Sequence, residues 1–168
     1  MSGTHASPLA QPRGARRATV AVVAALLALA AVGAGCATSM TADELDGRLR
    51  AAGREVRGLR APHVFPLYAA TRMEAYTLLA DARTESRERE SLDLAQQFAV
   101  AKTRRLHMIV GGPYADLNRQ VVWNALSYHE GVALPGLVIV YASPGEPDAD
   151  LLALAKRKRV QLIHRPLD

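Results

Sequence analysis

This chain of 168 residues contains very little cysteine and none of four common catalytic or ligand-binding motifs. It has one cysteine, so neither an intrachain disulfide nor a metal cluster built on several cysteines is possible. The phosphate-binding patterns GxGxxG and GxxxxGK(S/T) are absent, as are the GxSxG nucleophile elbow and the HExxH metal motif. We therefore expect no catalytic residue, no metal site, no cofactor and no enzymatic activity.

The single cysteine, Cys36, comes directly after an apolar segment. The first 17 residues carry three arginines and no acidic residue, and Val20–Val32 consists only of Val, Ala and Leu. The small residues 33–35 then precede the cysteine. A basic region, an apolar region and a small-residue cleavage zone are the three parts of a secretory signal. Residues 1–36 resemble the signal peptides of bacterial lipoproteins.

This resemblance implies that residues 1–35 are removed and that Cys36 is acylated as the new N-terminus. The protein would then be exported and held on a membrane by lipid. The outer membrane, on its periplasmic face, is favoured in a Gram-negative cell, and otherwise the outer face of the plasma membrane. Two alternatives remain: release as a soluble protein after cleavage at Ala34 or Ala37, or an uncleaved anchor. The run Ala18–Gly35 is at the short edge of the ~20 residues that span a bilayer.

We expect the rest of the chain to consist of a short spacer, residues 36–41, and a single mature domain, residues 42–168. The net charge of +5 arises largely from the three arginines of the signal, because no acidic residue is removed with them. The basic composition is therefore no argument for nucleic-acid binding. We expect no nucleic-acid partner.

Residues 42–105 are expected to be mainly helical. Thr41 and Glu44 form a capping-box pattern at the start of a helix that Pro62 would end. Apolar residues then recur with the alternating spacing of a heptad seam. The seam either packs on its own domain or docks a partner protein, and its candidate interface residues are Leu45, Leu49, Val56 and Leu59. Residues 69–105 form either a helical hairpin or one long helix with a charged middle.

From residue 106 the pattern changes to short apolar runs that alternate with helical segments. Runs at 106–110, 137–141 and 160–164 predict strands, and a helix capped by Asp116 lies between the first two. This alternation is typical of a parallel sheet with right-handed crossovers. We predict an α/β fold: N-terminal helices followed by a small three-stranded parallel β-α-β-α-β sheet.

Two groups of residues are candidate binding sites. Ligands of parallel sheets bind at the carboxyl ends of the strands, where the sequence places Gly111, Gly112, Asp116, Ser143 and Arg165. The only tryptophan, Trp123, falls on the side of its helix away from the sheet, so either the N-terminal helices cover it or it is a candidate anchor for a protein partner. The basic run 156–159 either complements a helix dipole or contacts anionic lipid or an envelope polymer.

The function that these features favour is a lipid-anchored envelope protein that binds a protein partner or helps to assemble a membrane complex without catalysis. The first alternative is a small anionic-ligand-binding domain that uses the carboxyl edge of the sheet. The second is an atypical hydrolase, which would need a histidine beside Ser143.

Overall fold

The computed structural model describes residues 40–84 and 89–167. The predicted signal peptide, Cys36 and most of the spacer therefore lie outside the described residues. None of the helices in the described part of the chain combines the length and the hydropathy needed to cross a membrane.

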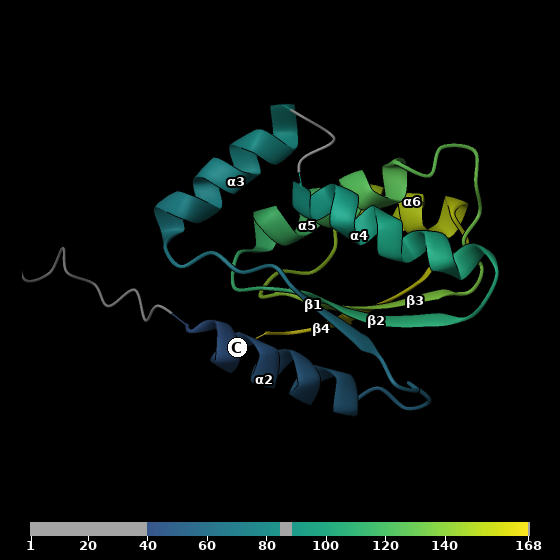
Figure 1. Cartoon of the computed structure of the whole chain (residues 1–168), viewed down its shortest axis with the longest axis horizontal. Coiled ribbons are helices and arrows are strands. Elements are labelled where there is room, and N and C mark those ends of the chain that lie inside the picture. The colour runs from purple at the N-terminus through teal and green to yellow at the C-terminus, as the bar shows by residue number, and fades with distance from the viewer. Residues whose placement is uncertain (1–39, 85–88, 168) are drawn as a thin grey trace, which may run out of the picture. The chain divides into compact units, whose positions relative to one another are not determined.

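A four-stranded parallel sheet forms the centre of the domain (Figure 1). The strands stand side by side in chain order, and their bounds are β1 (His63–Pro66), β2 (Leu106–Gly111), β3 (Leu137–Ala142) and β4 (Gln161–Arg165). The α/β class and the parallel sheet are as predicted. The prediction of three strands is wrong, because β1 lies within the segment expected to be mainly helical.

The additional strand is short and lies at an edge of the sheet. It has four residues, His-Val-Phe-Pro, and pairs with β2 from His63↔Met108 to Pro66↔Gly111. A proline removes one backbone donor, which an edge strand tolerates. A half-buried strand this short has no clear hydrophobic periodicity, so its pairing with β2 identifies it better than its own sequence does.

Helices cover both faces of the sheet (Figure 1). Helix α2 (Ala42–Arg54) lies against one face. The other face carries α3 (Arg72–Thr84), α4 (Arg89–Ala99), α5 (Ala115–Ser127) and α6 (Ala149–Arg157), with the short 3-10 helix η1 (Val100–Lys102) after α4. The buried residues accordingly form two hydrophobic clusters, a larger one beneath α3–α6 and a smaller one beneath α2.

Helix α2 begins with the predicted capping box. The Glu44 backbone N–H donates to the Thr41 hydroxyl at 3.2 Å, and the Thr41 backbone N–H donates to the Glu44 carboxylate at 2.9 Å. Hydrogen bonding to Thr41 lowers the pKa of Glu44. The helix ends at Arg54, well before Pro62, and an irregular loop leads into β1.

The apolar seam of α2 faces the domain's own sheet. Leu45 and Leu49 are fully buried and Val56 is 9% exposed, in one cluster with Ile109 of β2 and Val140 of β3. These side chains are therefore not available as the partner interface that the heptad spacing suggested. The spacing arises because one narrow stripe of α2 covers a flat sheet. Leu59, in the following loop, remains partly exposed.

Helices α3 and α4 are separate, and each packs against α5. The Asn124 side-chain amide of α5 donates to the Ala82 carbonyl at 2.8 Å and lies 3.4 Å from the Ser91 hydroxyl. One continuous helix would separate residues 82 and 91 by about 13 Å along its axis, which one nitrogen cannot bridge. The charged segment between these helices, 85–88, lies outside the described residues.

The cap of α5 differs from expectation. Helix α5 starts after Tyr114, whose side chain forms no capping hydrogen bond, and Asp116 lies exposed in its first turn. Asp116 is therefore not the predicted cap. Helix α6 is capped by Asp148, whose carboxylate accepts the Leu151 backbone N–H at 2.8 Å.

Candidate functional site

The predicted ligand site at the carboxyl edge of the sheet is closely packed. A Cβ on Gly111 would lie 1.7 Å from the Ala142 carbonyl oxygen, and a Cβ on Gly112 would lie 2.1 Å from that of Leu67. Both glycines are thus needed for the close approach of backbone segments. The pair does not form an open loop whose N–H groups receive an anion.

Buried polar side chains fill this edge. Asn118 is fully buried, and its amide nitrogen donates to the Gly112 carbonyl at 2.7 Å and to the Ser143 hydroxyl at 3.2 Å. Ser143 is fully buried as well. His164 lies 3.1 Å from the carbonyl oxygen of Ser143, so its ring is not placed to take a proton from the hydroxyl. This geometry does not support the hydrolase alternative.

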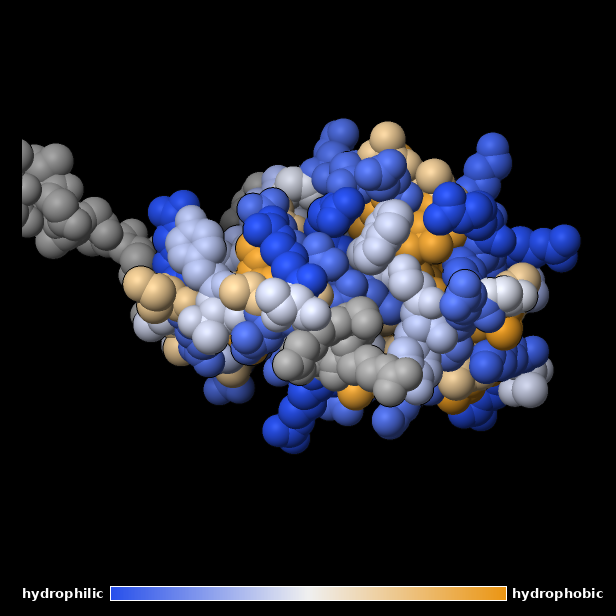
Figure 2. Space-filling model, turned by 90° about the horizontal axis from the view of Figure 1, so that it is seen from above, coloured by the Kyte–Doolittle hydropathy of each residue, from blue (hydrophilic) through white to orange (hydrophobic). Residues whose placement is uncertain are grey.

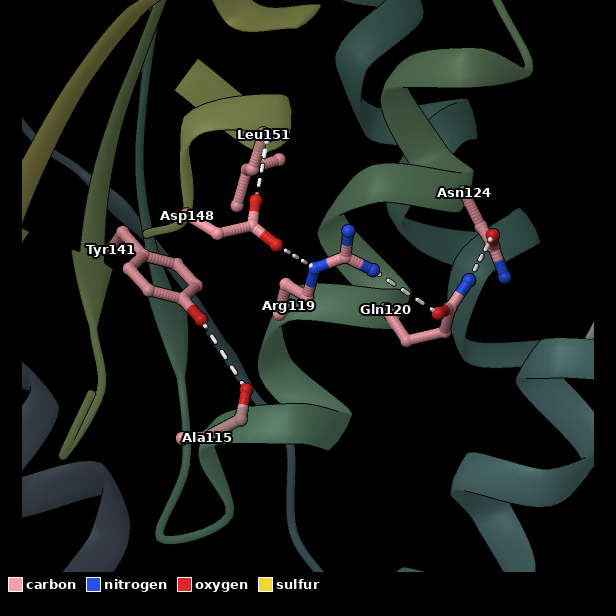
Figure 3. A network of polar contacts seen from close by, with 7 residues as sticks. All are labelled: Ala115, Arg119, Gln120, Asn124, Tyr141, Asp148 and Leu151. Atoms are coloured by element: carbon pink, nitrogen blue, oxygen red, sulfur yellow. Dashed lines mark hydrogen bonds and ion pairs between the residues drawn. The ribbon is translucent and has the colours of Figure 1, made fainter. Parts of the chain in front are cut away.

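The neighbouring contacts join β3 to α5 and α6 (Figure 3). The buried Tyr141 hydroxyl donates to the Ala115 carbonyl at 3.4 Å, and burial raises the pKa of Tyr141. Arg119 of α5 pairs with Asp148 at 2.5 Å. The hydrogen bond from the Leu151 N–H is the main cause of the lowered pKa of Asp148. The network ties the helices together.

The other predicted residues are dispersed. Arg165 is partly buried, with its Nε 3.8 Å from the Glu55 carboxylate. Trp123 is partly buried against the larger cluster, with the Arg119 guanidinium 5.4 Å from its ring centroid. Only part of the tryptophan therefore remains for an interface. Figure 2 shows the face of α3–α6 as mainly hydrophilic, with hydrophobic residues in separate small patches.

A strongly basic pocket opens at the opposite edge of the sheet, where β1 and β2 begin. We call it the arginine pocket; its volume is about 760 Å³. Its lining residues are Arg60, His63, Arg104, Arg105 and His107, with Gly58, Ala61 and Leu106 between them. No acidic residue of the described ranges lines it. Arg60, Arg104 and Arg105 are exposed and form no salt bridge with an acidic residue in the described ranges.

The fold brings these side chains together from two segments that are distant in the sequence. Arg60 and His63 precede and begin β1, whereas Arg104 and Arg105 directly precede β2. Because β1 and β2 are adjacent and parallel, their starts lie at the same edge. The Arg60 backbone N–H donates to Nδ1 of the buried His107 at 2.7 Å, which fixes the loop to β2.

The loop that forms one wall of the pocket has an unusual backbone. Gly58 has a φ of +86° and Ala61 a φ of +41°. Glycine adopts this left-handed region without steric cost, whereas alanine rarely does. The hydrogen bond to His107 and the pairing of β1 that follows hold Ala61 in this conformation.

The remaining basic cluster, 156–159, also lies at this edge, in the last turn of α6 and the two residues that follow it. Lys158 is buried and its ammonium group donates to the His129 carbonyl, while Arg159 has a φ of +58°. Lys158 thus closes a helix end and does not project toward a lipid surface. Arg157 and Arg159 border a second depression of about 850 Å³, but Glu130 lines it too.

Charges of opposite sign therefore predominate at the two ends of the strands, with Glu130 at the amino edge and Arg165 at the carboxyl edge as exceptions. Basic residues at the amino edge include Arg57, Arg60, Lys102, Arg104, Arg105, Arg157 and Arg159. Acidic residues at the carboxyl edge, in the first turns of α5 and α6 and the loop before α6, include Asp116, Glu146, Asp148 and Asp150. At the end where the strands begin, on the right in Figures 1 and 2, strongly hydrophilic side chains project from the surface.

Sequence reasoning missed the arginine pocket because it missed β1. Recognising His63–Pro66 as a strand beside β2 would have placed the basic residues before both strands at one edge. The described part of the chain contains no group of three or more His, Cys, Asp or Glu side chains that could hold a metal ion. No protein-family model, no curated protein and no solved structure matches this chain.

Proposed function

We propose that this protein is an exported envelope lipoprotein, acylated at Cys36, whose domain binds an anionic envelope partner without catalysing a reaction. The observation that carries the binding proposal is the arginine pocket, in which three arginines and two histidines meet without an acidic residue. The proposal places the protein on the periplasmic face of the outer membrane, or on the outer face of the plasma membrane where there is no outer membrane.

Arginine suits the recognition of carboxylate and phosphate groups. Its planar guanidinium donates two parallel hydrogen bonds to such a group and keeps its charge at any physiological pH. Arg104 and Arg105 are adjacent in the chain, and Arg60 lines the same pocket from a loop fixed by His107. Like charges repel one another, so their gathering in one depression favours a bound anion that neutralises them.

The lipid anchor rests on the sequence of residues 1–36. Feeding cells a clickable fatty acid should label the wild-type protein and should not label the Cys36→Ser variant. A labelled Cys36→Ser variant, or an unlabelled wild type that is nevertheless exported, would refute acylation at this position.

Anion binding is tested with the full-length protein in phosphatidylcholine bilayers. Titration with pyrophosphate should show binding that weakens as salt rises, because screening reduces charge attraction. The Arg104→Gln/Arg105→Gln variant should bind at least tenfold more weakly. Arg83→Gln, which removes an exposed arginine from α3, is the matched control and should bind as the wild type does. Equal affinity in all three proteins contradicts the proposal.

A further inference from the structure

We propose that the ligand is an amphiphilic anion: a phosphate-type head group that occupies the arginine pocket and an alkyl chain that lies in an adjoining apolar groove. This inference rests on the proposed anion-binding function and names the ligand class of the same site. The groove has a volume of about 430 Å³ and shares Ala61 with the arginine pocket. Its apolar lining is Val56, Leu59, Pro62, Val64 and Ile109.

The register of the sheet places the arginine pocket and the apolar groove next to one another along β2. His107 and Ile109 are two residues apart on β2, so their side chains point to the same face of the sheet about 6–7 Å apart. Val64 of β1 pairs with Ile109 and shares its face. The floor therefore changes from imidazole to aliphatic side chains along a single strand.

Helix α2 packs closely on the sheet where it borders the groove. Gly53 of α2 lies directly over Ile109: a Cβ at this position would stand 2.3 Å from the Ile109 Cδ1 atom. Beside it, Arg50 and Arg54 border the groove. Arg50 forms a salt bridge with Asp46 at 2.6 Å, whereas Arg54 forms none with an acidic residue in the described ranges, so Arg54 adds positive charge beside the apolar floor.

The chemistry of the two depressions selects among anionic ligands. Among the described residues, no Phe, Tyr or Trp lines either of them, so the larger rings on which nucleobases usually stack are missing there. The aliphatic lining instead favours a saturated chain, and the acid-free arginine pocket favours a head group with charge of the opposite sign. Leu59 and Val64 are partly exposed, so an alkyl chain that covers them removes apolar surface from water.

The test compares inorganic phosphate with monobutyl and monohexyl phosphate, each below its micelle concentration, in titrations of the full-length protein in phosphatidylcholine bilayers. Burial of each methylene should raise the affinity about fourfold, so hexyl phosphate should bind about 15-fold more tightly than butyl phosphate. Leu59→Ser should abolish most of this gain and leave the affinity for inorganic phosphate unchanged. Leu152→Ser, at an exposed leucine of α6, should preserve the gain.

The outcomes separate this inference from the function on which it rests. Phosphate binding that depends on Arg104 and Arg105 without any gain along the alkyl series overturns the amphiphile and leaves the anion site in place. A gain that is equal in Leu59→Ser and wild type also overturns it, because the chain then lies elsewhere. Failure of every member of the series to bind overturns both proposals. Thermal unfolding of each variant checks that it is folded.

Two sources supply this chemistry: a lipid within the bilayer and a released amphiphile. Adding phosphatidic acid to the phosphatidylcholine bilayer distinguishes them. Competition that weakens hexyl phosphate binding identifies a lipid within the membrane as the source. Unchanged hexyl phosphate binding identifies a dissolved ligand.

Discussion

Two glycines of α2 allow the packing of this helix on the sheet to be measured with one type of substitution. Gly47 lies in the exposed part of the helix, and a Cβ there meets no atom within 4 Å. Gly53 is buried, and a Cβ there would stand 2.3 Å from Cδ1 and 3.2 Å from Cγ1 of Ile109. The side chain of Ile109 is itself only 1% exposed, so it has little free space into which to move.

Replacement of each glycine by alanine should have opposite effects on the free energy of unfolding. Gly47→Ala should stabilise the protein by about 0.5–1 kcal/mol, the usual gain in helix propensity. Gly53→Ala gains less helix propensity because it lies near the helix end. Its Cβ must also displace Ile109, and overpacking of a core costs about 1–3 kcal/mol. We expect a net destabilisation of about 1–2 kcal/mol, and thus a difference of about 2 kcal/mol between the two variants.

Urea denaturation, followed by the fluorescence of Trp123 and by circular dichroism, measures both values. Ile109→Val removes the Cδ1 atom, so Gly53→Ala should cost less in that background than in the wild type, which a double-mutant cycle will detect. If Gly53→Ala is as stabilising as Gly47→Ala, α2 does not pack on the sheet as described. The reasoning that makes its seam part of the core would then be wrong.

Three further predictions concern stability. Burial is the main cause of the lowered pKa of His129. Because the unfolded chain binds a proton at this residue more tightly than the folded one, stability should fall as the pH drops below the usual pKa of 6.5. In urea denaturation measured at a series of pH values, His129→Gln should weaken this fall in stability. Asp148→Ala should cost about 0.5–2 kcal/mol in urea denaturation through loss of the α6 cap, whereas Asp148→Asn should cost much less because asparagine also caps. Gly112→Ala should cost about 3 kcal/mol or more in the same assay, because its Cβ meets a backbone carbonyl that cannot turn aside.

The sequence predicted the second half of the fold well. The expected strands at 106–110, 137–141 and 160–164 agree with β2, β3 and β4 to within one residue at each end. Strands β2 and β3 are easily recognised because they lie between two helical layers, and a strand covered on both faces needs apolar residues along its length. The edge strand β4 is only partly buried and includes Gln161, His164 and Arg165. The turns between the strands contain Gly and Pro, which mark where each strand stops.

The first half was harder because its decisive contacts are between residues distant in the sequence. The seam from Leu45 to Val56 fits a docking helix and a core helix equally well, and only the contact with Ile109 distinguishes them. The basic edge escaped prediction for a related reason. The rule that ligands bind at the carboxyl ends of strands takes no account of the neighbouring carbonyl groups that occupy the space beside Gly111 and Gly112. The basic edge, in turn, depends on the pairing of β1 with β2.

The direction of the helices explains why opposite charges gather at the two ends of the strands. Helices α5 and α6 connect parallel strands, so they begin at the carboxyl edge and end at the amino edge. Acidic residues stabilise helix starts and basic residues stabilise helix ends, as Asp148 and Arg157 illustrate for α6. The same arrangement gives the domain an electric dipole moment along its strands. A polyanion approaching in solution would turn the domain before contact, so the arginine pocket would meet it first and the association rate would fall with ionic strength.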